Sequence, residues 1–238
     1  MKFWNWLKSL FTTKQTVEIK GERPNVDEPK KLLWYPAMEA KIAPMKSRGK
    51  YRKGYPEGAV VHFTAGRSLL GAKNAKNTVE GGIKNGFMFF VIDKDGLVYQ
   101  NFPLSDWGYH AGTSSWPSLG TSVSSKLVGI EIANAGSVKP LKDKFVSWFG
   151  EIYEPEQVRH IKEKRDALDP TGYYHKYTVA QETSLISLLL WMHKNNPEVF
   201  KLENVIGHHE CSPRRKNDPG GSLSMSMTAL RAKLKSLI

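Results

Sequence analysis

Short apolar runs separated by turn residues dominate the middle of the chain, and they predict the strands of a buried β-sheet. The runs lie at residues 59–66, 87–92, 97–102 and 127–134. The tetrapeptide Asp93-Lys94-Asp95-Gly96 separates the second run from the third and predicts a hairpin. Two polar residues interrupt these runs, His62 near the end of the first and Glu131 within the last.

Each of these two polar residues has an ordinary interpretation and a functional one. A histidine in an apolar strand is more often a satisfied core residue than a ligand, but His62 is followed directly by a polar turn. A carboxylate in an apolar run is costly to bury unless it is paired or used. Glu131 therefore indicates a functional site if its strand is central, whereas on an edge strand it would simply face water.

Helical patterns occupy much of the rest. Thr178-Val179-Ala180-Gln181 is a capping box that predicts a helix to about residue 195, with Ile186, Leu189 and Leu190 on its apolar face. Residues 78–85 predict the end of another helix. Residues 224–238 predict a last helix with Leu230, Leu234 and Leu237 on one side. Residues 139–176 are charged and aromatic without clear periodicity, and we expect a partly helical insertion that could wall a groove.

The N-terminal part differs in composition from the rest. The formal net charge is +12, and residues 1–58 carry 13 Lys and Arg against 6 Asp and Glu. We expect a basic tether at 1–54 followed by one domain at 55–238. Residues 1–11 predict a short amphipathic helix that either lies on an anionic membrane or docks on protein. They are too short to span a bilayer, which needs about 20 apolar residues.

The charge favours an anionic partner, which could be nucleic acid, lipid or a cell-wall polymer. No nucleic-acid-binding motif is present, so we expect no specific nucleic-acid partner. The N-terminal segment also makes a poor cleavable signal peptide, because Lys8 interrupts its apolar run. Cys211 is the only cysteine in the sequence, which excludes an intramolecular disulfide.

The richest candidate chemistry lies in residues 207–220, after the short apolar run Val205-Ile206. Turn residues such as Ser212-Pro213 and Asn217-Asp218-Pro219-Gly220 allow this loop to fold back and bring His208 beside Asp218. On its own such a pair is more often a solvated turn than a metal site. With His62 it forms a set of two imidazoles and one carboxylate, which suits a catalytic zinc site that keeps one position for water.

Two further groups could complete such a site. Glu131 could take a proton from the attacking water and deliver it to a leaving amine. Lys216 could stabilise the developing oxyanion. The Gly- and aromatic-rich loop at residues 107–116 suits a sugar- or peptide-binding wall that includes Trp107, His110 and Trp116. Its ordinary interpretation is a loop whose rings cap the core.

In combination these motifs resemble the type-2 N-acetylmuramoyl-L-alanine amidases, zinc enzymes that share a fold with the peptidoglycan-recognition proteins. The similar segments are Val60-Val61-His62-Phe63-Thr64, the loop from Trp107 to Trp116, Gly129-Ile130-Glu131-Ile132, and Gly207-His208 through Asp218-Pro219-Gly220. The resemblance covers about residues 55–222.

The resemblance implies an α/β fold with a central mixed sheet flanked by helices and a zinc site at the strand ends. It implies Zn²⁺ as the cofactor, held by His62, His208 and Asp218, with Glu131 and Lys216 as catalytic groups. In some branches of the family the third ligand is a cysteine at a shorter spacing. Cys211 is only three positions after His208, so we assign Asp218 and regard Cys211 and His209 as bystanders.

The implied activity is hydrolysis of the amide between N-acetylmuramic acid and L-alanine in peptidoglycan. We expect a protein made in the cytoplasm that acts on the bacterial wall, as a lytic phage endolysin or as a wall-remodelling enzyme. Two alternatives from other classes are a non-catalytic peptidoglycan-binding receptor on the same fold and a nucleic-acid-binding protein.

Overall fold

The main sheet of the computed structural model has the strand order β1-β5-β4-β9-β3-β15. Four adjacent strands at one side of this sheet run parallel, with β15 at the edge: β4 (Phe89–Ile92), β9 (Val128–Ile132), β3 (Ala59–Phe63) and β15 (Val205–Gly207). Their apolar runs are the ones that the sequence predicts as strands. Strand β5 (Val98–Gln100) returns antiparallel to β4 after the predicted hairpin, and β1 (Ala40–Lys41) pairs with β5. The expected mixed sheet is confirmed.

Alternation along the strands gives this sheet two different faces. Val61 of β3 and Ile130 of β9 belong to the large apolar cluster that also contains Leu188 and Leu189 of helix α3. Val60 faces the other way, into a smaller cluster with Val123, Leu127, Ile206 and Cys211. The face opposite α3 therefore carries the alternate positions of β3 and β9, which include His62 and Glu131.

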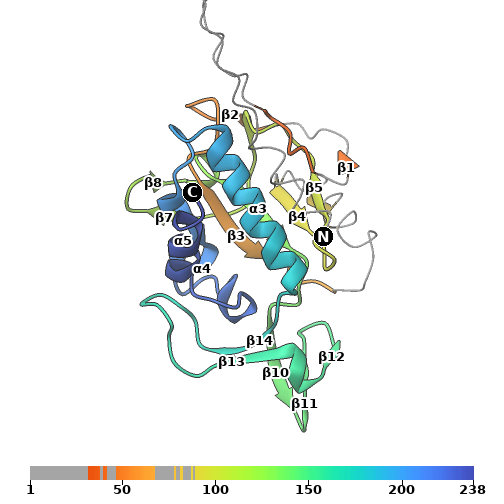
Figure 1. The fold of residues 1–238 in the computed structure, drawn as a ribbon. Helices are drawn as coiled ribbons and strands as arrows, with labels where there is room; N and C mark the ends of the chain where they lie inside the picture. The colour runs from red at the N-terminus through yellow and green to blue at the C-terminus, as the bar shows by residue number, and fades with distance from the viewer. Residues whose placement is uncertain are drawn as a thin grey trace, which may run out of the picture. The chain divides into compact units, whose positions relative to one another are not determined.

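Helix α3 (Val179–Asn195) begins at the predicted capping box, where Thr178 Oγ1 accepts a hydrogen bond from the Gln181 backbone N–H. The helix crosses the sheet in Figure 1 and buries its apolar face there. The last helix, α5 (Met227–Lys235), is shorter than predicted. Leu230 and Leu234 are buried, but Leu237 lies beyond the helix and is half exposed.

The expectation of a partly helical insertion at residues 139–176 is wrong. This part of the chain forms a five-stranded antiparallel sheet, in the order β12-β11-β10-β14-β13, with one 3₁₀ turn. Tyr153, Val158 and Tyr173 pack in a small cluster of its own. The strands are only two to five residues long, so each is too short to show a clear alternation of apolar and polar positions.

The strands of this second sheet are β10 (Ser137–Leu141), β11 (Lys144–Val146), β12 (Ile152–Tyr153), β13 (Val158–Ile161) and β14 (Gly172–His175). Two small ribbons pair β2 (Gly49–Lys50) with β6 (Asp106–Trp107) and β7 (Ser115–Trp116) with β8 (Gly120–Thr121). The short helices are η1 (Val123–Ser125), η2 (Pro155–Gln157), η3 (Leu202–Asn204), α4 (His208–Cys211) and η4 (Gly220–Ser222).

The structure describes residues 32–37, 40–41, 47–67, 78, 81–82, 87 and 89–238. The predicted amphipathic segment at 1–11, most of the tether and most of the predicted helix at 78–85 lie outside these residues. Tyr35 is buried, and its backbone N–H donates to Gln100 Oε1 at 2.7 Å, so this position packs on the main sheet. Within the described part of the chain, no helix is both long and apolar enough to cross a bilayer.

Candidate metal centre

The ends of two adjacent parallel strands place the two candidate histidine ligands side by side. His62 is the penultimate residue of β3, and Val61 pairs with Gly207, the last residue of β15. His208 follows directly and begins the short helix α4, which the sequence pattern did not predict. Because the register aligns His208 with His62, the two imidazoles meet at the same end of the sheet.

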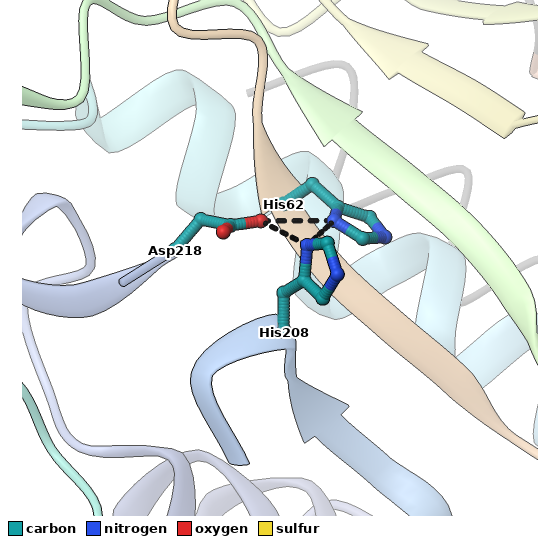
Figure 2. A group of neighbouring side chains, drawn as sticks. All are labelled: His62, His208 and Asp218. Carbon is teal, nitrogen blue, oxygen red and sulfur yellow. Dashed lines mark hydrogen bonds and ion pairs between the residues drawn. The ribbon is translucent and has the colours of Figure 1, made fainter. Parts of the chain in front are cut away.

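Asp218 completes a group of three buried side chains whose polar atoms point at one another (Figure 2). The distances His62 Nδ1 to His208 Nδ1, His62 Nδ1 to Asp218 Oδ2, and His208 Nδ1 to Asp218 Oδ2 are all 2.9 Å. None of the three residues is more than 5% exposed. The loop that returns from α4 therefore brings the carboxylate to the histidines, although it lies ten positions after His208.

This donor set has the chemistry and the size of a zinc site. Zinc binds imidazole nitrogen and carboxylate oxygen at about 2.0–2.2 Å, and a triangle with edges of 2.9 Å lets one ion reach all three atoms. Two imidazole nitrogens at hydrogen-bonding distance cannot both be bare acceptors unless a cation or a proton lies near them. The residues present therefore fit a divalent metal ion.

Burial and charge keep two of the candidate ligands, His62 and Asp218, in the forms that bind a metal. Burial, together with the neighbouring His208, lowers the pKa of His62 to about 4, against the opposing effect of Asp218. Burial alone would raise the pKa of Asp218, but hydrogen bonds from His208 and His62 outweigh it and hold that pKa below its ordinary value. At neutral pH His62 is neutral and Asp218 is ionised, which are the ligating forms.

Glu131 lies on the same side of the sheet as the metal ligands. Its Cα pairs with that of His62 across β9 and β3, and side chains of paired residues leave a sheet on one face. The residue is half-buried, yet its Oε2 is inaccessible and has no hydrogen-bond partner among the described residues. Burial, and then the charge of Asp218, raise the pKa of Glu131 well above its ordinary value, whereas Lys216 opposes the shift.

Lys216 is exposed, and its charge acts on the same group of residues. Its charge lowers the pKa of both His62 and Glu131. The structure thus gathers five predicted residues at one end of the sheet: His62, Glu131, His208, Lys216 and Asp218.

The three predicted substrate-binding residues do not share one environment. Trp107 lines a separate cleft of about 450 Å³ with Lys50, Arg52 and Lys126. Trp116 packs against the small cluster that contains Val60 and Ile206. Of the three, His110 alone contacts the metal ligands, through a 3.2 Å contact between its Nδ1 and His62 Nε2.

His209, regarded from sequence as a bystander, holds the loop that carries Asp218. Its backbone N–H and its Nδ1 each lie 2.9 Å from the Asp218 carbonyl oxygen. Its Nε2 faces the buried Asp169 at 3.6 Å. Asp169 in turn pairs with Arg165, whose Nε lies 2.5 Å from Asp169 Oδ2.

The insertion fastens the same loop with two arginines. Arg165 donates to the carbonyls of Gly220 at 2.8 Å and Leu223 at 2.9 Å, and Arg159 donates to Gly221 at 2.6 Å and Ser222 at 3.1 Å. These contacts join residues 55 to 63 positions apart, so no local sequence signal indicates them. The only sequence signal for a role of these two arginines is that they are basic residues in a segment without periodicity.

The fold and this cluster define the class of protein. Residues 52–221 match the family described as N-acetylmuramoyl-L-alanine amidase, and the chain belongs to that family.

The individual relatives agree with this assignment. The amidase AmiD of Escherichia coli strain K12 is 28% identical over 123 residues, and this match spans 52% of the present chain but only about a third (33%) of the E. coli protein. Two solved structures share the fold. A selenomethionine derivative of AmpD has a TM-score of 0.50 at 18% identity, covering 84% of this chain and 96% of AmpD.

AmiD of E. coli in complex with anhydro-N-acetylmuramic acid-L-Ala-D-gamma-Glu-L-Lys has a TM-score of 0.51 at 21% identity, covering 79% of this chain and 61% of that one.

Proposed function

We propose that the protein is a zinc-dependent N-acetylmuramoyl-L-alanine amidase. It would cleave the amide between N-acetylmuramic acid and the L-alanine of the peptidoglycan stem peptide. The observation that carries the proposal is the buried triangle of His62 Nδ1, His208 Nδ1 and Asp218 Oδ2, with Glu131 on the same face. Family membership and the substrate printed for the AmiD complex agree with that reaction.

In this proposal His62, His208 and Asp218 hold the zinc ion. When bound, zinc supplies a Lewis acid that polarises the scissile carbonyl and lowers the pKa of water. Glu131 accepts the proton of the attacking water and then passes it to the leaving amine of L-alanine. Burial raises the pKa of Glu131 above its ordinary value, which makes this carboxylate a stronger base.

Lys216 would stabilise the negative charge that develops on the carbonyl oxygen. The side chain is exposed, and its charge acts on both His62 and Glu131. The remaining substrate contacts that we propose are those predicted for Trp107, His110 and Trp116. The basic N-terminal segment, residues 1–54, would in addition bind an anionic membrane or cell-wall polymer.

Purified wall material provides the direct test. The protein should release stem peptides with a free L-alanine amino terminus from peptidoglycan, and EDTA should stop the release until zinc is restored. The Glu131→Gln variant should bind zinc normally and lose roughly 10²- to 10⁴-fold in kcat. Release of reducing sugar ends in place of free amino termini would contradict the proposed bond.

The same assay separates the two alternatives. A wall-binding receptor would bind peptidoglycan and zinc without turnover, and Glu131→Gln would then bind the wall as wild type does. A nucleic-acid-binding protein would show tight, salt-sensitive DNA binding and leave walls intact. A lytic role requires that the protein clear intact cells as well as purified walls.

A further inference from the structure

The ring of His110 lies between a metal-ligand histidine and the backbone of the central sheet. Its Nδ1 is 3.2 Å from His62 Nε2, and its Nε2 is 2.9 Å from the carbonyl oxygen of Leu127. The ring rests against Gly129 of β9, where an added Cβ would come within 2.8 Å of His110 Cγ. The absence of a side chain at Gly129 therefore creates the slot that this ring occupies.

For a neutral His110 ring, the order of donors and acceptors in this chain of contacts has one solution. A carbonyl oxygen only accepts, so the proton of the neutral His110 ring is on Nε2, which donates to Leu127. His110 Nδ1 is then an acceptor, and His62 Nε2 must carry the proton that it accepts.

The residue next to His110 does the same for the other histidine ligand. His208 Nε2 lies 3.0 Å from the carbonyl oxygen of Ala111, which is closer than the 3.5 Å to the Arg215 guanidinium, so that nitrogen also carries its proton. The backbone N–H groups of His110 and Ala111 both donate to Ser124 Oγ, at 3.2 and 3.0 Å. One anchored dipeptide thus faces the outer nitrogen of both imidazoles, leaving each Nδ1 turned toward Asp218.

We propose that His110 is a positioning residue: it holds His62 as the tautomer protonated on Nε2 and so presents a bare Nδ1 to the metal ion. This inference rests on the proposed zinc site, and it gives His110 a role distinct from the substrate contact predicted from sequence. An outer hydrogen bond of this kind fixes both the tautomer and the orientation of a ligating ring, and its loss typically weakens metal affinity 10- to 100-fold.

A matched pair of variants tests the acceptor itself. His110→Asn keeps an acceptor near the position of Nδ1, and His110→Leu has nearly the same volume without one. The measurements are zinc affinity by competition with a chromophoric chelator and the thermal melting of each protein with EDTA. We expect His110→Leu to lose about 10- to 100-fold in zinc affinity, His110→Asn to stay within a few-fold of wild type, and the two metal-free proteins to melt alike.

Three outcomes would overturn the inference. The first is wild-type zinc affinity in His110→Leu, and the second is an equal loss in both variants, which would make the ring a packing element only. The third is a set of ¹⁵N chemical shifts that place the His62 proton on Nδ1 in the zinc-loaded wild-type protein. This measurement does not depend on any variant folding. If wild type itself binds no zinc, the proposed function fails first, so the two failures are distinguishable.

Discussion

His62 and Glu131 are paired residues on adjacent parallel strands, so their side chains leave the same face of the main sheet. The opposite face is filled by helix α3 and its apolar contacts. The pairing puts a candidate metal-binding imidazole and a partly buried carboxylate side by side without any loop between them. A one-residue shift in register would move Glu131 into the apolar core.

Loss of Asp218 should remove the metal. Asp218→Ala takes away the only carboxylate of the triangle. Loss of a group that only hydrogen-bonds to a metal ligand already lowers metal affinity about 10- to 100-fold, and loss of a ligand itself should cost more. We therefore expect the zinc affinity to fall by more than about 100-fold. Competition with a chelator measures it, and Asp143→Ala, at an exposed turn of the insertion, is the control. Retained stoichiometric zinc in Asp218→Ala would refute the ligand assignment.

Replacing Lys216 should slow the reaction without loosening the metal. Lys216→Ala removes one charge that acts on both His62 and Glu131, and loss of one oxyanion-stabilising donor typically costs about 10²- to 10³-fold in kcat. Steady-state kinetics on a soluble muropeptide measures the effect, with exposed Lys233→Ala as the control. An unchanged kcat in Lys216→Ala would remove this residue from the mechanism.

Glu131→Gln should stabilise the metal-free protein at neutral pH. The folded pKa of Glu131 lies well above its ordinary value of 4.5, so the carboxylate costs stability once the pH exceeds that value. The variant should therefore exceed wild type in free energy of unfolding at pH 7, and the difference should shrink as the pH falls to 4. Urea denaturation with EDTA measures both. Equal stabilities at pH 7 would show that the carboxylate is not strained.

Arg165 should support the loop that carries Asp218. Arg165→Met leaves Asp169, which is 1% exposed, without its guanidinium partner, and breaking a buried ion pair costs about 3–5 kcal/mol. Denaturant unfolding measures this loss, and zinc affinity should fall with it. Because the double variant Arg165→Met, Asp169→Leu buries no unpaired charge, it should recover part of the stability. No recovery would mean that the carbonyl contacts of Arg165 matter more.

His175 should make the protein less stable as the pH falls. Burial, and then the charge of Lys94, lower its pKa from 6.5 to about 3. The unfolded chain therefore takes up a proton below pH 6.5 that the folded protein refuses, and stability is lost between these values. Against His175→Phe, wild type should lose about 1.4 kcal/mol more per pH unit between pH 6 and 4. If the free energies of unfolding of wild type and His175→Phe changed with pH in parallel, this prediction would be wrong.

The site could be predicted from the sequence to the extent that its residues stand at recognisable positions. His62 and Glu131 are polar residues inside apolar strands, and turn residues surround His208 and Asp218. The residues that fix these side chains and the ligand loop in place could not be predicted in the same way. His110 contacts His62 across 48 positions, and Arg165 reaches Gly220 across 55, so their partners are set by folding alone.

By itself the sequence determined the strands of the main sheet other than β1, which lies in the predicted tether, the start of helix α3 and the identity of the candidate ligands. Each of these depends on the order of apolar, polar and turn residues within a few positions, which is local physics. Only the tertiary structure decided that residues 137–175 form an antiparallel sheet and that His209 and two arginines secure the ligand loop. The reason is that strand pairing and buried hydrogen bonds join distant segments, and their free energy exists only once those segments are packed together.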